Sequence, residues 1–150
     1  MNDIKTKQNP IMNKKCIFCK IIKDEMPSHK VFEDEHTIAF LDINPINPGH
    51  VLVVPKAHTE RLSTLDDQTA IALFKTVKMI EGAVSEMPDC SGTNLIQNNG
   101  RSAGQLIDHV HVHIVPRVSG DSFRFKYDKI DENQKRLAEF AGLYRERLRI

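Results

Sequence analysis

The sequence is organised around the stretch DHVHVHIVPR, residues 108–117. Three histidines alternate in it with three β-branched apolar residues. Successive side chains of a β-strand point to opposite faces of the sheet, so the alternation predicts a strand over residues 108–117. One face would carry the imidazoles of His109, His111 and His113, and the other would place Val110, Val112 and Ile114 against the core.

A row of three imidazoles has no packing role in a sheet, so its chemistry has to explain it. Neutral imidazole binds metal ions, an unprotonated ring nitrogen is a nucleophile, and histidine transfers protons near neutral pH. On a straight strand the first and third imidazoles lie roughly 13 Å apart, too far for one ion. The spacing argues against a catalytic metal held by all three histidines, and it leaves the other roles open.

The composition fits one globular domain: the chain has 150 residues, of which 40% are apolar. We expect residues 1–14 to form a flexible N-terminal arm and residues 15–150 to form the domain. A formal net charge of +1 argues against bulk binding to nucleic acid or to an anionic membrane. No segment has the ~20 apolar residues of a membrane span or the apolar centre of a secretory signal, so we expect a cytoplasmic protein.

The cysteines support a cytoplasmic metal site. In a reducing compartment, Cys16 and Cys19 with their C-x-x-C spacing indicate a metal or redox site and not a structural disulfide. The redox interpretation expects a βαβ setting, which the following sequence does not offer. Zinc needs two further nitrogen or sulfur ligands, and downstream histidines can supply them. Cys90 stands alone and is interpreted as an incidental thiol.

Apolar periodicity divides the rest of the chain into elements. Strands are predicted over residues 30–33, 37–42, 50–55, 92–98 and 108–117, after a short helix over 18–24. The strand at 50–55 is apolar throughout, so we expect it to be covered on both faces. A long helix should begin at a Thr64 cap and end before Pro88, and a last helix should begin at Asp131. The last helix is expected to bury a stripe formed by Leu137, Phe140, Ala141, Tyr144 and Leu148. Hairpin-linked strands with one inserted helix favour an α+β fold with an antiparallel sheet.

Two loops carry candidate ligand groups. Asp42 lies where a strand passes into a proline-rich loop, a position that often holds functional groups. Residues 99–105 contain Gly100 and Gly104, which would let backbone N–H groups approach an anion, and they lead directly into the histidines. We interpret this second loop as a phosphate cradle, with an ordinary hairpin loop as the alternative.

These motifs, in this order, resemble the histidine-triad (HIT) superfamily. The segment HVHVHIV at residues 109–115 is similar to its H-φ-H-φ-H-φ-φ signature. Supporting matches are CIFCKII at 16–22, AFLDI at 39–43, GHVLVVPKAH at 49–58, NNG at 98–100 and AGQ at 103–105. Together they span roughly two thirds of the chain, and the C-x-x-C form resembles the bacterial Hint-like branch.

The resemblance implies a fold and an activity. The fold would be a five-stranded antiparallel sheet with one long central helix and a C-terminal helix, usually in a homodimer. The activity would be hydrolysis of nucleoside phosphoramidates or related nucleotidyl substrates, purines preferred, through a covalent nucleotidyl-histidine. His111 would be a surface-facing nucleophile, and His113 or His50 would help to place or deliver the proton that the leaving group needs.

The resemblance also implies binding residues. Base and ribose would contact Ile17, Phe18, Ile21, Phe40, Asp42 and Ile43, with Asp42 accepting from ribose hydroxyls. The phosphate side would contact Asn98, Gly104, Gln105, Leu106, His111 and His113. A structural zinc ion would be held in a closed tetrahedral site by Cys16, Cys19, His58 and His109.

Two departures from the family pattern leave other functions open. Leu106 follows Gln105 where many Hint-type members carry a hydroxyl residue, and the chain has no tryptophan. A nucleotide-binding or scaffold protein with little turnover is therefore one alternative. A dinucleoside polyphosphate hydrolase is another.

Overall fold

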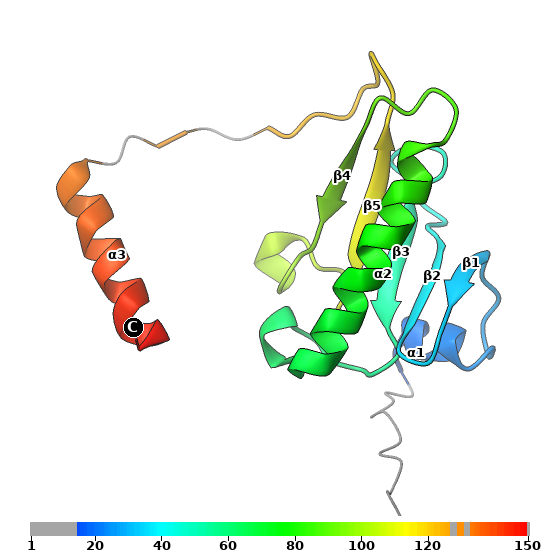
Figure 1. Ribbon diagram of the computed structural model, residues 1–150, viewed down its shortest axis with the longest axis horizontal. Coiled ribbons are helices and arrows are strands. Elements are labelled where there is room, and N and C mark those ends of the chain that lie inside the picture. Colours follow the sequence, from blue (N-terminus) through cyan, green and yellow to red (C-terminus); the bar gives the residue numbers. More distant parts are fainter. Residues whose placement is uncertain (1–14, 127–128, 131–132, 150) are drawn as a thin grey trace, which may run out of the picture.

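The computed structural model describes residues 15–126, 129–130 and 133–149, so the predicted N-terminal arm and Asp131 lie outside the described residues. Five strands form one antiparallel sheet in the order β1-β2-β3-β5-β4, which confirms the α+β prediction (Figure 1). The strands are β1 Lys30–Glu33, β2 Thr37–Leu41, β3 Val51–Pro55, β4 Gly92–Ile96 and β5 Val112–Arg117. The helices are α1 Ile17–Ile22, α2 Asp67–Ser85 and α3 Gln134–Leu148, with 3-10 turns at Leu62–Thr64 and Arg101–Ala103.

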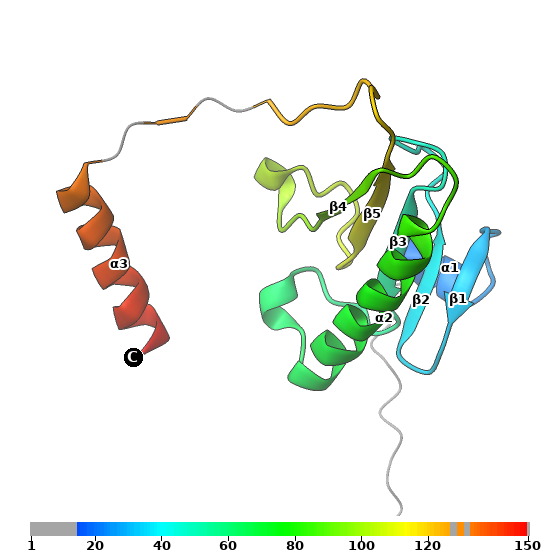
Figure 2. The same ribbon diagram turned by 45° about the horizontal axis from the view of Figure 1, so that its top comes forward.

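The sheet separates two apolar clusters. On one face α2 packs side chains such as Leu73 and Val77 against the sheet (Figure 2). On the other face α1 contributes Phe18 and Ile21 to a second cluster. Strand β3 supplies both clusters, because Val51 and Val53 belong to the first and Leu52 and Val54 to the second. The prediction that this strand is covered on both faces is confirmed.

The histidine strand is shorter than its sequence pattern suggests. The ladder of β5 begins at Val112, which pairs with Val53 of β3, and not at residue 108. Although β3 continues to Pro55, the ladder stops at this pair, and the Val110 N–H donates at 2.7 Å to the Thr59 carbonyl, which lies beyond the end of β3. The alternation still holds, because Val110, Val112 and Ile114 are all buried in the α2-side cluster.

The long central helix is present, but its predicted cap is wrong. Asp66 is the N-cap, and its carboxylate accepts from the Thr69 N–H at 2.9 Å. Thr64 instead belongs to the preceding 3-10 turn and donates its hydroxyl to the Arg61 carbonyl. Among the described residues, no helix is both long enough and apolar enough to cross a membrane.

Helix α3 also departs from its prediction. It begins at Gln134, and the Asn133 side chain caps it by accepting from the Arg136 N–H. The expected burial of its apolar stripe is wrong: no described residue of α3 is buried, and Tyr144 is 67% exposed. Figures 1 and 2 both show α3 standing apart from the sheet, beyond β4. The sequence pattern marks a face that needs a partner, but the partner is not the core of the same domain.

Candidate active site and metal cluster

The three histidines lie on the face of the sheet that α1 covers. The Phe18 ring meets His109 and His111 edge to face, with centroids 5.9 and 5.1 Å apart. His109 and His111 are buried, and His113 is partly exposed. The prediction of a surface-facing His111 is therefore wrong, because α1 and Phe18 cover its ring.

The sulfur and nitrogen atoms predicted to bind zinc converge on one point. Nδ1 of His109 lies 3.4 Å from Sγ of Cys16, 3.7 Å from Sγ of Cys19 and 3.2 Å from Nδ1 of His58. Zinc bonds of about 2.0–2.1 Å to nitrogen and 2.3 Å to sulfur give a tetrahedron with edges of about 3.3–3.8 Å. The four residues thus fit a closed tetrahedral metal site, and all their ligand atoms lie within 4.8 Å of one another.

His109 presents the correct nitrogen to this cluster. Its Nε2 lies 2.8 Å from the Pro55 carbonyl, which can only accept, so Nε2 carries the proton and the Nδ1 lone pair faces the thiols. Burial lowers the pKa of His109 to about 4, which keeps the ring neutral at pH 7. Neutral imidazole is the form that binds metals.

His111 is held in the opposite tautomer. Its Nδ1 donates to the carbonyl of His109 at 2.6 Å, so the neutral ring has its lone pair on Nε2. Burial lowers the pKa of His111, although the hydrogen bond to the His109 carbonyl partly opposes this shift. An unprotonated ring nitrogen at neutral pH is what a histidine nucleophile requires.

A backbone N–H fixes the tautomers of the other two histidines. The Ile46 N–H donates to Nδ1 of His50 at 3.1 Å, so the proton of a neutral His50 lies on Nε2. Nε2 of His50 is 2.9 Å from Nδ1 of His113, which must then accept. Burial lowers the pKa of His113 to about 4, with His111 and His50 adding to the shift. His113 is therefore neutral at pH 7 and carries its proton on Nε2.

Asp42 lies beside this pair. Its Oδ1 accepts from the Asn44 N–H, and its Oδ2 is 3.7 Å from Nε2 of His50 and 3.9 Å from Nδ1 of His113. These three side chains are close enough to hold a metal ion. However, the proton on His50 Nε2 occupies the position where an ion would bind. This arrangement therefore suits a hydrogen-bond relay better than a catalytic metal.

The predicted base-side residues come together in part. Phe18, Ile21 and Phe40 lie in one buried cluster with Ile17 packed against it, and the rings of Phe18 and Phe40 are 5.5 Å apart. Ile43 differs, because it is 81% exposed. A ligand at this site would therefore meet a fixed aromatic wall and an exposed apolar side chain.

The structure contradicts the predicted phosphate cradle at three of its backbone N–H groups. The backbone N–H groups of Ala103, Gly104 and Gln105 all donate to carbonyls within the loop. The Gln105 side chain is buried and also committed, because it donates to the Glu60 and Ile107 carbonyls and accepts from the Gly100 N–H. These groups shape the loop and do not point at an anion.

The other predicted phosphate-side residues lie around this loop. Asn98 Nδ2 would lie 3.8 Å from a Cβ added at Gly104, whose φ of +85° favours glycine. Leu106 is 76% exposed. The Asn98 amide is thus the polar side chain that the loop offers beside Gly104.

Sequence reasoning missed Asn47, which anchors the loop that carries Ile46. The Asn47 side chain donates at 2.9 Å to both the Pro116 carbonyl and Asp121 Oδ2, and the Asn47 backbone carbonyl accepts from the His50 N–H. Arg117 of β5 donates to the Asp121 carboxylate and holds the pKa of that carboxyl well below its usual range. Only the asparagine in a proline-rich loop hinted at this role.

Replacing Asn47 by alanine is expected to disturb the tautomers of His50 and His113. Loss of two hydrogen bonds should lower the free energy of unfolding by about 1–3 kcal/mol and release the Ile46 N–H from its fixed position. The ¹⁵N shifts of both rings should then move toward values for exchanging tautomers. Asn44→Ala in the same loop is the matched control. Among the described residues, Asn44 bonds through its backbone N–H and not through its side chain, so the substitution removes no hydrogen bond. Unchanged ring shifts in Asn47→Ala would refute this role.

Comparison with known proteins places the chain in a family. The HIT domain model matches residues 23–120. The chain is 43% identical over 106 residues to an adenosine 5′-monophosphoramidase of Candida albicans, covering 68% of this chain and 70% of that protein. A HIT family structure from Bacillus subtilis matches with a TM-score of 0.85 and 39% identity, covering 89% and 97% of the two chains. A Zn-bound histidine triad family protein from Mycobacterium smegmatis matches with a TM-score of 0.70 and 32% identity over 86% and 97%. The chain belongs to the HIT domain family.

Proposed function

We propose that this protein is a nucleotidyl hydrolase that cleaves nucleoside phosphoramidates, with a purine nucleotide such as AMP as the bound half. The observation that carries the proposal is the tautomer of His111, whose bond to the His109 carbonyl leaves the Nε2 lone pair free of any proton. The Candida albicans relative, an adenosine 5′-monophosphoramidase by name, supports the same reaction class.

The reaction proceeds in two displacements at the α-phosphorus. Nε2 of His111 attacks phosphorus, the P–N bond breaks, and the leaving nitrogen takes up a proton. Water then attacks phosphorus and breaks the P–His111 bond, returning one proton as it does so. The two steps together consume one water molecule and release an amine and a nucleoside monophosphate.

The neighbouring imidazoles serve the leaving group. Nε2–H of His113 is directed away from His50 and is free to donate to a phosphate oxygen or to the leaving nitrogen. His50 holds His113 in this tautomer, so the pair places the proton on the correct ring nitrogen. The N–H groups of Ala103, Gly104 and Gln105 donate to loop carbonyls, so His113 and Asn98 take the part that these groups would have in a backbone cradle.

The nucleoside half fits the other residues around His111. Phe18 and Phe40, with Ile17 and Ile21, form the apolar wall for a purine base, and exposed Ile43 closes over it. Asp42 keeps Oδ2 outside hydrogen-bond reach of both histidines, so it can accept from ribose hydroxyls. Leu106 lies on the phosphate side, where its exposed side chain contacts the leaving group.

The cysteine–histidine cluster holds a structural zinc ion in this proposal. Two thiolates and two imidazoles fill a tetrahedron and leave no position for a substrate, so the ion stabilises the fold without entering the reaction. The Zn-bound relative supports the choice of metal. Thiolate ligands need a reducing compartment, which agrees with a cytoplasmic protein. We further propose that the active form is a homodimer.

Incubation with adenosine 5′-phosphoramidate, with and without a chelator, tests this function. We expect AMP to form under both conditions at a temperature where the protein remains folded. AMP that appears only with metal would replace the covalent mechanism by metal-dependent hydrolysis. Tight nucleotide binding without AMP formation would instead establish a binding or scaffold protein.

A further inference from the structure

Helix α3 is an amphipathic helix whose apolar stripe is exposed in the part of the chain that the structure describes. Leu137, Phe140, Tyr144 and Leu148 recur at helical spacing and form one apolar stripe, and each is at least 44% exposed. A single helix of this length is only marginally stable in water, because helices gain most of their stability from packing. The stripe therefore needs a surface to cover.

The fold directs α3 away from its own sheet. At the end of β5, Arg117 binds Asp121 and the Phe123 carbonyl and stacks on the Phe123 ring. This network fixes the start of the connection to α3. Figures 1 and 2 show α3 beyond β4, which is the edge of the sheet opposite β1.

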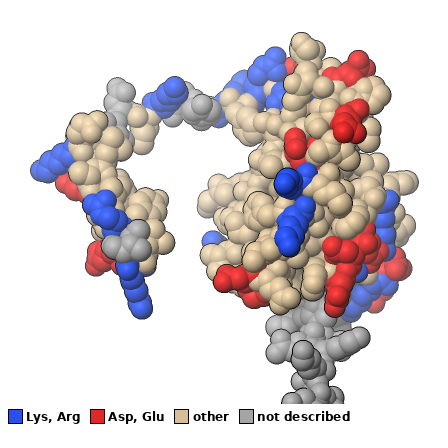
Figure 3. All heavy atoms as spheres, in the orientation of Figure 1, with Lys and Arg blue, Asp and Glu red and all other residues tan. Residues whose placement is uncertain are grey.

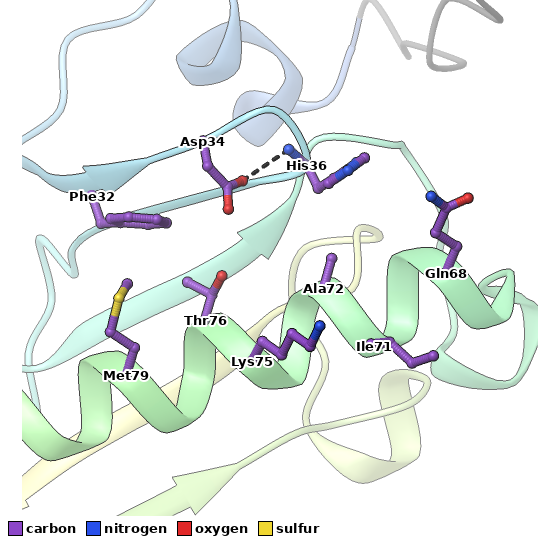
Figure 4. Close-up of a pocket in the computed structure, with 9 residues that line it drawn as sticks. All are labelled: Phe32, Asp34, His36, Gln68, Ile71, Ala72, Lys75, Thr76 and Met79. Carbon is purple, nitrogen blue, oxygen red and sulfur yellow. Dashed lines mark hydrogen bonds between the residues drawn. The ribbon is translucent and has the colours of Figure 1, made fainter.

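A hollow of about 350 Å³ lies near the β1 edge of the sheet, between the β1–β2 hairpin and α2 (Figure 4). Phe32, Ile71 and Met79 give it apolar walls, and Ile71 and Met79 are about half exposed. Asp34 and Lys75 stand at its polar margin. Such a hollow can receive an aliphatic or aromatic side chain, and the histidine site does not use it.

Charge favours contact between α3 and the body of another copy. Residues 15–126 carry 14 acidic against 12 basic side chains, with Asp34 and Glu35 at the hairpin tip beside the hollow. Figure 3 shows basic side chains gathered on α3. That helix has four basic residues, Lys135, Arg136, Arg145 and Arg147, against the acidic Glu139 and Glu146, and its C-cap Arg149 is a fifth cation.

We propose that α3 of one copy docks its apolar stripe over the hollow between the β1–β2 hairpin and α2 of a second copy. In a two-fold dimer both helices are exchanged, so two stripes and two hollows are covered at once. The arginines of the last α3 turn then approach Asp34 and Glu35 of the hairpin tip. The exchange rests on the homodimer proposed above and does not depend on the reaction at His111.

Sedimentation of paired variants tests whether the stripe and the hollow stabilise the dimer. Phe140→Ser in the stripe and Met79→Ser in the hollow should each raise the dimer dissociation constant about 30-fold or more. Glu139→Ser on the opposite face of α3, and Met87→Ser beyond the end of α2, should leave it unchanged. A wild-type monomer, or a dimer that tolerates both stripe and hollow variants, would overturn the proposal.

Cross-linking between tagged chains tests the exchange itself. Two forms of the protein, one with Phe140→Cys and one with Met79→Cys, are mixed after Cys90→Ser has removed the remaining thiol outside the metal cluster. A short thiol cross-linker should join the two tags, whereas Phe140→Cys with Met87→Cys should give little product. If α3 covers the hollow of its own chain, no cross-link joins the two forms, and the exchange is wrong.

Discussion

Replacement of His111 by asparagine is expected to lower kcat for phosphoramidate hydrolysis by about 10³-fold or more, because the attacking nitrogen is lost. Asparagine is preferred to alanine for two reasons. His111 is buried against Phe18, and the amide of an asparagine at this position can still donate to the His109 carbonyl. The fold should therefore survive, as circular dichroism and thermal melting can show. Steady-state kinetics with adenosine 5′-phosphoramidate measures the loss.

His29→Asn provides the matched control, because His29 is exposed and lies outside the site. Its kcat should equal that of the wild-type protein. If folded His111→Asn retains wild-type turnover, the attacking group is not His111, and the covalent mechanism cannot stand.

Replacement of Cys16 or Cys19 by alanine is expected to remove the metal and to lower the melting temperature by about 10 °C. A metal present at about 1,000 times its dissociation constant adds about 4 kcal/mol to the free energy of unfolding. Each kcal/mol shifts the melting temperature of a chain of this size by about 2–4 °C. Elemental analysis should find about one zinc per wild-type chain and much less in either variant. At low temperature both variants should still hydrolyse the phosphoramidate.

Cys90→Ala is the control for thiol loss, because Cys90 lies outside the cluster and its sulfur donates to the Gly92 carbonyl. It should keep both metal and melting temperature. A wild-type protein without metal, whose melting no chelator changes, would exclude the zinc site. Loss of turnover on metal removal from a protein that stays folded would make the metal catalytic.

The alternation of residues 109–114 predicted the central architecture because it reports which side chains face the core. Val110, Val112 and Ile114 are buried as expected, although the ladder starts only at Val112. Strand pairing depends on which carbonyl each N–H reaches, and the Val110 N–H donates to Thr59 beyond the end of β3. Local periodicity carries no information about that limit.

The chemistry of the site depends on contacts that no local pattern records. The Pro55 carbonyl and the Ile46 N–H decide which nitrogen of His109 and His50 carries a proton, and both belong to other elements. For the same reason the sequence does not show that the N–H groups of Ala103, Gly104 and Gln105 donate to carbonyls of their own loop. The stripe of α3 was recognised correctly as apolar, but amphipathicity does not say which chain covers it.

The direct test of a covalent reaction at His111 is intact-mass analysis of the wild-type protein, quenched without acid during turnover of adenosine 5′-phosphoramidate. We expect a transient population heavier by one nucleotidyl group, lost on mild acid treatment and formed equally in the presence of chelator. Peptide mapping should place the group on His111. The mechanism would be contradicted if AMP continued to form while repeated quenching during turnover showed no heavier species. An adduct on a different residue would also contradict it.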